Sequence, residues 1–448
     1  MANTFFRSLA LVGAVALIPA ATTSFAAVDV DTYKELDQFM NVFERVRSEY
    51  VEQVDDKTLL RGAIDGMLAS LDPHSSYLDE DGFKNLMTQT EGEYGGLGLN
   101  VTMEDGAVKV IAATEDAPAE KAGMKAGDYI THINGQLIYG GTLDEAVDQM
   151  RGPPGTTIKL TVVRPGRDKP FDVSITRAII ALPAVKWEIK DRVGILNVNT
   201  FNKTTTESVQ AAMTAIEKSL GGKPLGYVLD LRSNPGGLLD QAVSLSDLFL
   251  HRGEIVSQRG RGKNDIDRYY ARPGDLAEGL PVVVLIDSGS ASASEIVAAA
   301  LQDHHRALVM GETSFGKGSV QTLLPLTART ALRLTTARYY TPSGRSVQEG
   351  GVSPDIVVPQ LSDPDYKSRP KFREADLRRH LINELKVDDS VIQDDGKPDP
   401  RFTATAEELE KQGIEDFQLH YAVNTIARLD KIQSAAATPA PANKTGTR

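Results

Sequence analysis

The sequence contains no cysteine, and among its 448 residues there are only seven histidines and one tryptophan. A chain without cysteine forms no disulfide and no thiolate-ligated metal site. The histidines lack the H-E-x-x-H spacing of a zinc site, and the adjacent pair His304 and His305 would diverge in direction on a helix. We therefore expect no metal ion and no other cofactor.

Long apolar runs are confined to the first residues of the chain. Arg7 precedes the apolar stretch 9–20, and Ser24-Phe25-Ala26 follows it. This pattern predicts a secretory signal peptide over residues 1–26 and hence a periplasmic or secreted protein. The stretch is short for a membrane span, so an uncleaved anchor in the inner membrane is the less favoured alternative.

Basic residues are outnumbered, with 49 Lys and Arg against 61 Asp and Glu, which gives a formal net charge of -12. An acidic chain is repelled by phosphate backbones, so nucleic acid is excluded as an expected partner. A mature chain of about 420 residues is too long for one hydrophobic core and predicts two or three packed units.

Small hydroxyl residues gather where a strand is predicted to turn into a helix. The run Val282–Ile286 is apolar and rich in Val, as expected of a buried strand, and the segment Gly289-Ser-Ala-Ser-Ala-Ser-Glu295 leads into a helix of small residues. A helix N-terminus offers unpaired N–H groups and a partial positive charge, which suits a nucleophile. Lys317 follows between two glycines, and serine with lysine forms a hydrolase site without histidine.

Two other interpretations fit parts of this pattern. Ser292 and Glu295 match a capping box, which would only start the helix. Residues 311–317 match the phosphate-loop pattern G-x-x-x-x-G-K, but Gly318 stands where Ser or Thr is required. The following residues alternate like a strand rather than a helix, which argues against a phosphate loop.

The rest of the chain decides among these interpretations. Six segments occur in the order found in the carboxyl-terminal processing proteases, also called tail-specific proteases, and together they resemble that family over residues 36–360. They are Leu71-Asp-Pro-His-Ser-Ser-Tyr-Leu78, Gly95-Gly-Leu-Gly-Leu99, Asp230-Leu-Arg-Ser-Asn-Pro-Gly-Gly237, Ser290-Ala-Ser-Ala-Ser-Glu295, Gly316-Lys-Gly-Ser-Val-Gln321 and Gly351-Val-Ser-Pro-Asp-Ile356.

The resemblance implies a serine endopeptidase with a Ser-Lys dyad. It assigns the nucleophile to Ser292, the general base to Lys317 and a supporting amide to Gln321, and it leaves turn and cap roles for Ser290 and Ser294. The oxyanion hole then falls to the N–H of Ala293 and to a glycine after the Asp230 strand, with Gly237 preferred over Gly236. Every expected catalytic side chain is present, which argues against the rival function of an inactive peptide-binding scaffold.

A catalytic lysine must lose its proton near neutral pH, although a free lysine has a pKa of about 10.4. Burial away from water favours the neutral amine. A glutamine beside it can accept a hydrogen bond without adding charge, whereas a carboxylate there would raise the pKa of Lys317. The amide of Gln321 therefore has a chemical reason to occupy its position.

Residues 92–177 resemble a PDZ domain, which captures protein C-termini. Backbone N–H groups of the glycine-rich loop would bind the terminal carboxylate, and the peptide would add as a strand beside residues 99–101. The helix over residues 142–151 would flank the groove. The expected contact residues are Gly95, Gly96, Leu97, Gly98 and Leu99.

The predicted fold is an α/β (α+β) multidomain protein with a ClpP/crotonase-like α/β core and an inserted PDZ domain. Predicted strands and helices alternate along the core segment, and this segment lies within the part of the chain that resembles the serine peptidases. Helices are also expected over 371–386 and 405–433. The predicted domains are a helical segment 31–90, the PDZ domain 92–177, the peptidase core 178–360, a helical region 361–433 and a disordered tail 434–448.

The expected function is cleavage of proteins near exposed C-termini that the PDZ domain has bound first. Expected partners are such protein or peptide substrates. By family resemblance, an adaptor lipoprotein and a homodimer or higher oligomer are also candidates. The natural substrate and the residue preferred at the cleaved bond stay open.

Overall fold

The computed structural model describes residues 30–104, 106–138, 142–366, 368–385, 399 and 401–437. The predicted signal peptide lies outside these residues, and so does the predicted tail from residue 438 onward. The chain divides into two compact units, residues 1–66 and 67–448, with the division inside helix α2. The first unit contains α1 (Val30–Glu49) and most of α2 (Asp56–Ala69).

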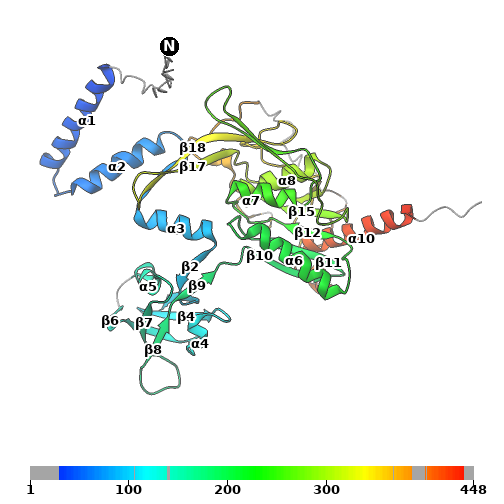
Figure 1. The fold of residues 1–448 in the computed structure, drawn as a ribbon, viewed down its shortest axis with the longest axis horizontal. Helices are drawn as coiled ribbons and strands as arrows, with labels where there is room; N and C mark the ends of the chain where they lie inside the picture. The colour runs from blue at the N-terminus through cyan, green and yellow to red at the C-terminus, as the bar shows by residue number, and fades with distance from the viewer. Residues whose placement is uncertain are drawn as a thin grey trace, which may run out of the picture. The chain divides into compact units, whose positions relative to one another are not determined.

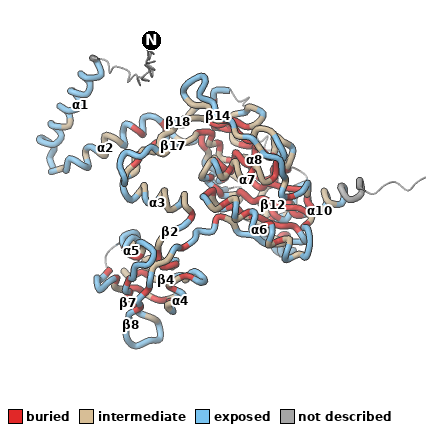
Figure 2. The backbone as a smooth tube through the Cα atoms, in the orientation of Figure 1, coloured by how far each residue is buried: buried red, intermediate tan, exposed pale blue. Residues whose placement is uncertain are grey.

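The second unit is built around a six-stranded sheet in the order β10-β11-β12-β15-β16-β19, where only β10 runs antiparallel to its neighbour. Figure 1 labels β10, β11, β12 and β15, and Figure 2 shows buried residues in red around β12. Alternate residues of its strands enter two separate cores, so the sheet is covered on both faces. The strands are β10 (Val185–Lys190), β11 (Val193–Val198), β12 (Tyr227–Asp230), β15 (Val282–Ile286), β16 (Leu308–Gly311) and β19 (Ile356–Val357).

Five helices pack on this sheet. Apolar side chains of three helices share one core with Leu196 and Leu229, and the other two helices share a second core with Ile195 and Val228. The first three are α6 (Thr205–Leu220), α7 (Leu239–Asp247) and α8 (Ala293–Asp303), and the other two are α9 (Ala406–Lys411) and α10 (Phe417–Ala437). The parallel strands and the crossover helices confirm the predicted α/β core.

A second sheet has the order β1-β18-β13-β14, with β17 paired to β18 (Figure 1). Its strands come from distant parts of the chain, because β1 lies near the N-terminus and pairs with β18 more than 250 residues later. They are β1 (Ser76–Leu78), β13 (Glu254–Arg259), β14 (Ile266–Tyr270), β17 (Ser319–Pro325) and β18 (Ala331–Tyr340). Helix α3 (Glu80–Glu91) follows β1 and ends at Gly92, which adopts a left-handed conformation.

The third sheet has its own core of buried apolar side chains, as expected of a separate domain. The order is β3-β4-β5-β7-β8, so β3 is an edge strand, and β6 pairs with β5. The elements are β3 (Leu99–Glu104), β4 (Ala107–Ala113), α4 (Pro118–Lys121), β5 (Tyr129–Ile133), β6 (Gln136–Leu137), α5 (Leu143–Met150), β7 (Thr157–Val163) and β8 (Phe171–Thr176). A two-stranded ribbon of β2 (Glu93–Gly96) and β9 (Ala178–Ala181) carries the chain into and out of this domain.

The helix predicted for residues 371–386 is wrong over the described part of that segment. Only Glu374–Asp376 forms a turn of 3₁₀ helix. Arg373 donates to the carbonyls of Ser314 and Gly350, and Glu374 accepts from Gln348, so side chains hold the segment against neighbouring loops. These long-range polar contacts override the local helical pattern.

The helix predicted for residues 405–433 is two helices, α9 and α10. Gly413 has a φ of +71° and ends the first, and α10 continues to Ala437 into the predicted tail. None of the helices in the described residues is both long and apolar enough to cross a membrane.

Candidate active site

A cavity of about 500 Å³ brings together residues from four parts of the second unit. Its walls come from α3, from the loop after β12, from the start of α8 and from the pair β17 and β18. The lining includes Leu86, Met87, Thr90, Phe201, Gly236, Gly237, Leu238, Ser292, Ala293, Ile296, Lys317, Ser319, Gln321, Leu323, Arg333 and Tyr339. All catalytic residues implied by the family resemblance therefore line one cavity.

Ser292 occupies the residue before α8, where a buried strand turns into a helix. Its φ of +55° lies in the left-handed region, which is uncommon for a residue with a side chain. Such strain persists where the surrounding structure fixes it and is frequent at functional sites. The turn presents the Ser292 side chain to the cavity at the positive end of the helix.

The two neighbouring serines hold the turn. Ser290 Oγ donates to the Leu231 carbonyl at 2.8 Å, and Ser294 Oγ donates to the Asn234 carbonyl at 2.9 Å. Both side chains are fully buried. Ser290 has the predicted turn role, since its Oγ also accepts from the N–H of Asp287. Ser294 is not a cap, because it lies inside α8 and Ser292 occupies the N-cap position. Ser292 is the serine of the three that lines the cavity.

Glu295 has a larger role than the capping box that its spacing predicts. Its Oε2 accepts from the N–H of Ser292 at 2.8 Å, which is the capping contact, and from the N–H of Lys317 at 2.9 Å. Its Oε1 accepts from the N–H of Gly316 at 2.7 Å and from Ser314 Oγ. One buried carboxylate thus joins the backbone of the proposed nucleophile to that of the proposed base.

Burial sets the ionisation of this carboxyl group. Desolvation raises the pKa of Glu295 to about 7, although hydrogen bonds from Ser314, Gly316, Ser292 and Lys317 act in the opposite direction. Sequence reasoning missed this function because three of the four donors lie 19 to 22 residues further along the chain.

The side chain of Lys317 is largely buried away from water. Desolvation lowers the pKa of Lys317, and the nearby guanidinium of Arg333 lowers it further, while Glu374, Glu295 and Asp72 act in the opposite direction. In the described part of the chain, Lys317 Nζ makes no ion pair. The amine therefore has the environment that a general base requires.

Gln321 lies in β17, four residues after Lys317, and lines the same cavity. Its Nε2 donates to Ser319 Oγ at 3.0 Å and to Thr335 Oγ1 at 3.2 Å. A hydrogen bond from Lys317 to the Gln321 carbonyl is not formed here, and that pairing stays a prediction.

The two candidate oxyanion glycines differ in what their N–H groups bind. The N–H of Gly236 donates to Asn234 Oδ1 at 2.9 Å, so it is already engaged. Gly237 lies in the cavity wall next to Phe201. A Cβ at Gly236 would lie 2.9 Å from both the Ser292 Cβ and the Ala293 nitrogen, so this position requires glycine for close approach.

The domain predicted to be a PDZ domain carries a separate groove between the edge strand β3 and helix α5. Four of the five predicted contact residues, Gly96, Leu97, Gly98 and Leu99, line it together with Val147 and Met150 of α5. Gly95 instead lies in the ribbon with β9, where a Cβ would lie 2.1 Å from the Gly152 carbonyl oxygen. The groove and its free strand edge have the form that peptide addition requires.

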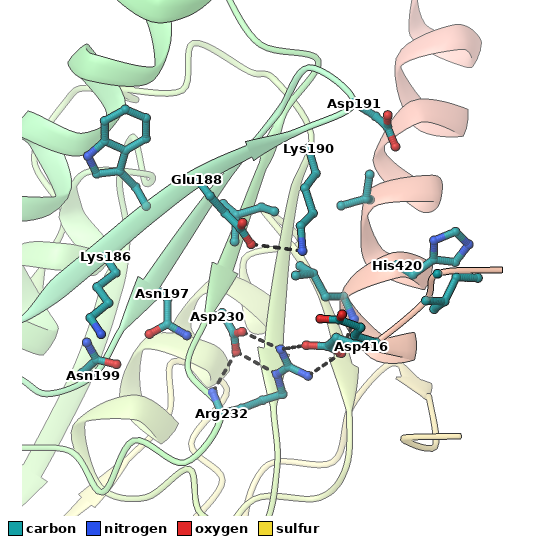
Figure 3. Close-up of a pocket in the computed structure, with 17 residues that line it drawn as sticks. Lys186, Glu188, Lys190, Asp191, Asn197, Asn199, Asp230, Arg232, Asp416 and His420 are labelled. Atoms are coloured by element: carbon teal, nitrogen blue, oxygen red, sulfur yellow. Dashed lines mark hydrogen bonds and ion pairs between the residues drawn. The ribbon is translucent and has the colours of Figure 1, made fainter. Parts of the chain in front are cut away.

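Another cavity lies between β10 and α10, away from the serine and lysine (Figure 3). Its floor contains an ion-pair network in which the Arg232 guanidinium binds Asp230 and Asp416, with Nη2 at 2.6 Å and 2.7 Å from their oxygens. Arg232 also donates to Gln418. The network fastens the end of β12 to the start of α10, so we assign it a structural function.

Replacing Asp416 by alanine will destabilise the protein by about 2 kcal/mol, because removing one member of a partly buried pair leaves Arg232 with only Asp230. Desolvation raises the pKa of Asp416, but the ion pair with Arg232 outweighs it and lowers the pKa to about 2. Its stabilising contribution is therefore complete above about pH 4 and is lost as the pH falls toward 2. Urea unfolding at pH 7 and pH 3 measures both effects, and equal losses at the two pH values would contradict this assignment.

No group of three or more His, Cys, Asp or Glu with metal-binding geometry occurs among the described residues.

Comparison with known proteins identifies the class. The model of peptidase family S41 matches residues 192–358, a PDZ domain model matches residues 109–164, and the model of the activating protease CtpB N-terminal domain matches residues 15–82. The chain is therefore a serine peptidase that carries a PDZ domain.

Relatives define the family more closely. The chain is 53% identical over 360 residues to the carboxy-terminal-processing protease of Bartonella bacilliformis, covering 80% of this chain and 83% of the relative. It is 36% identical over 344 residues to the carboxy-terminal processing protease CtpA of Bacillus subtilis, covering 76% and 72%. A solved photosystem II D1 C-terminal processing protease is 29% identical, with 73% of this chain and 91% of that chain covered and a TM-score of 0.42. The chain belongs to the family of carboxy-terminal processing proteases.

Proposed function

We propose that Ser292 and Lys317 form the catalytic dyad of this C-terminal processing peptidase. Neutral Lys317 takes the hydroxyl proton as Ser292 attacks the scissile carbonyl carbon, and the new C–O bond gives a tetrahedral oxyanion. Lys317 then donates that proton to the leaving amine, and the C–N bond breaks. Lys317 then deprotonates a water molecule that attacks the acyl carbon; the C–Oγ bond breaks, and Lys317 returns the proton to Ser292 Oγ as the carboxylic acid product leaves.

The observation that carries this proposal is the shared cavity in which Ser292, strained at a helix N-terminus, meets a lysine with a lowered pKa. The N–H groups of Ala293 and Gly237 are the proposed oxyanion donors. Gly237 is favoured over Gly236 because the Gly236 N–H is already bound to Asn234. Gln321 is the proposed supporting amide.

A fluorophosphonate that labels active-site serines tests the dyad directly. Labelling of the wild-type protein at Ser292, identified by peptide mass, supports the assignment. Labelling at another serine would overturn it. Absence of labelling in a folded protein would instead support the rival function, a PDZ scaffold with an inactive core.

We further propose that the PDZ groove binds the C-terminal carboxylate of the substrate before cleavage. A substrate with a free C-terminus will be cleaved about 10- to 100-fold more efficiently than the same substrate with an amidated C-terminus, because capture raises the local concentration of the scissile segment. Steady-state kcat/KM on the two substrates measures this difference.

A variant with a blocked groove supplies the control. Val147→Asp places a carboxylate in the groove wall, which repels a peptide carboxylate, and should abolish the preference without changing cleavage of the amidated substrate. Equal rates on free and amidated substrates in the wild type would contradict the proposed function of the groove.

The expected compartment, the periplasm, also belongs to this proposal, with the N-terminal apolar stretch as its support. An anchored form at the inner membrane is the alternative. Sequencing the N-terminus of the mature protein distinguishes cleavage after Ala26 from retention of the stretch. An adaptor lipoprotein and a homo-oligomer are proposed partners on the family resemblance alone.

A further inference from the structure

The N-terminal motif Leu71–Leu78 has no function in the mechanism above, yet part of it lies beside the proposed base. Strand β1 within it pairs with β18 at residues 331–333. Asp72 and Ser75 are buried against the next residues of β18, and Asp72 is one of the charges that act on the pKa of Lys317.

Asp72 is held as an ionised hydrogen-bond acceptor. Its Oδ1 accepts from the N–H of His74 and of Ser75, both at 2.8 Å, and from Thr335 Oγ1 at 3.1 Å. Its Oδ2 accepts from Ser75 Oγ at 2.8 Å. Desolvation acts against ionisation, but these hydrogen bonds prevail and hold the pKa of Asp72 below its usual value.

The ionised state of Asp72 determines whether Thr335 donates or accepts in its hydrogen bond with Gln321. An ionised carboxylate has no proton, so the Thr335 hydroxyl must donate its single hydrogen to Asp72. Thr335 Oγ1 is then left with lone pairs only, and it can bind Gln321 solely by accepting. The group of Gln321 that meets Thr335 must therefore be the NH₂ group, as the structure has it.

We propose that Asp72 and Thr335 are positioning residues that fix the orientation of the Gln321 amide and direct its carbonyl oxygen toward Lys317. The inference rests on the proposed role of Lys317 as general base. The two N–H bonds of Nε2 point to Thr335 and Ser319, which leaves Oε1 as the other end of the amide. Gln321 and Lys317 line one cavity, and because Nε2 is occupied by Thr335 and Ser319, Oε1 is the end of the amide that is left for the amine.

The orientation matters because a neutral amine has only one lone pair. A carbonyl oxygen accepts a hydrogen from the amine and leaves that lone pair free to take the Ser292 proton. In the reversed amide, an N–H would donate to the same lone pair and compete with Ser292. The hydrogen-bond sequence Asp72–Thr335–Gln321 excludes the reversed amide and keeps Lys317 available as a base.

The test is Thr335→Val, which removes the hydroxyl at nearly constant volume. We expect kcat to fall about tenfold, because the Lys317 amine is no longer held in one orientation. KM should be unchanged, because the groove that binds the peptide is intact. The acid limb of the kcat–pH profile should move to lower pH, because an N–H donated to the amine stabilises its neutral form. Thr335→Ser, which keeps the hydroxyl, should restore both values.

Thr336→Val is the matched control. Thr336 Oγ1 binds Thr322 Oγ1 at 2.6 Å across the same two strands, but on their exposed face. Removing this bond costs one hydroxyl pair in β17 and β18 without touching Gln321. Identical kcat and pH profiles for Thr335→Val and Thr336→Val would overturn the inference, whatever their melting temperatures.

If Thr335→Val does not fold, Gln321→Glu supplies a second test. A carboxylate facing Lys317 raises the lysine pKa, so the acid limb should move to higher pH. An unmoved limb would overturn the inference. Ser292→Ala, assayed in parallel, distinguishes failure of this inference from failure of the proposed dyad. Full activity in Ser292→Ala would mean that the dyad itself is misassigned.

Discussion

Replacing Lys317 by methionine will abolish peptidase activity and raise the melting temperature of the protein at pH 7. Activity should fall by about 10⁴-fold or more, as for removal of one member of a catalytic unit. The stability gain follows because methionine has a similar length but needs no water, whereas burial disfavours the charged lysine.

The stability gain from Lys317→Met depends on pH, because it reflects the protonation of the lysine. The pKa of Lys317 is lowered in the folded state, so the unfolded state binds more protons between the folded pKa and the unfolded value of about 10.4, and the resulting penalty is constant below that window. The lysine therefore destabilises the fold at neutral and acid pH. This penalty disappears as the pH approaches 10.4, and the two proteins should then converge.

The experiment compares wild type, Lys317→Met and Lys218→Met by thermal unfolding and by cleavage of an unfolded substrate. Lys218 is exposed near the end of α6, so its replacement should leave activity unchanged and bring no stability gain. Ser292→Ala should be equally inactive and folded. Residual activity above one hundredth of wild type in Lys317→Met would contradict the assignment of the base.

Replacing Glu295 by glutamine will have the largest effect outside the dyad. The carboxylate accepts from four donors, and an amide must place its NH₂ group against two of them. Each unsatisfied buried donor costs about 1–3 kcal/mol. The backbone of Ser292 and Lys317 then loses its common anchor, and kcat should fall by about 10²-fold, since small displacements of reacting groups have effects of that size.

The same variant isolates the titration of Glu295. The pKa of about 7 in the folded state exceeds the unfolded value, so the folded state binds more protons between about pH 4.3 and 7. The free energy of unfolding therefore falls as the pH rises through this window, by about 4 kcal/mol, and is constant above it. Glu295→Gln should lack this component.

Urea unfolding of the two proteins from pH 4.5 to 8 measures the component as a difference, so the titration of other groups cancels. Glu407→Gln is the control, since Glu407 is exposed in the first turn of α9. Its difference from wild type should not change with pH. A constant difference for Glu295→Gln as well would show that the carboxyl group is ionised throughout.

Much of the core was predictable because its strands are fully buried. Val282–Ile286 is a continuous apolar run, and the structure gives it the predicted bounds. Both faces of such strands meet helices, so a run of apolar residues bounded by polar ones is enough to define them. Local sequence alone did not choose among the three serines of this turn, and the assignment of Ser292 as nucleophile came from the family resemblance.

The contacts around the site were less predictable because they join residues far apart in the chain. Thr335 Oγ1 reaches Asp72 over 263 positions, and His74 reaches Glu374 over 300. Nothing near Glu295 in sequence shows that its partners include the loop at Gly316. Likewise, the irregular segment at Arg373 is held by distant carbonyls, which a local helical pattern does not register.

The pairing of β1 with β18 has a consequence for how the protein comes into being. A ribosome completes residues 76–78 long before it reaches residues 331–333, so the sheet beside the base closes only when most of the chain has been synthesised. Closing so long a loop is also a slow step in folding. The nascent polypeptide therefore lacks this part of the site until most of its synthesis is complete.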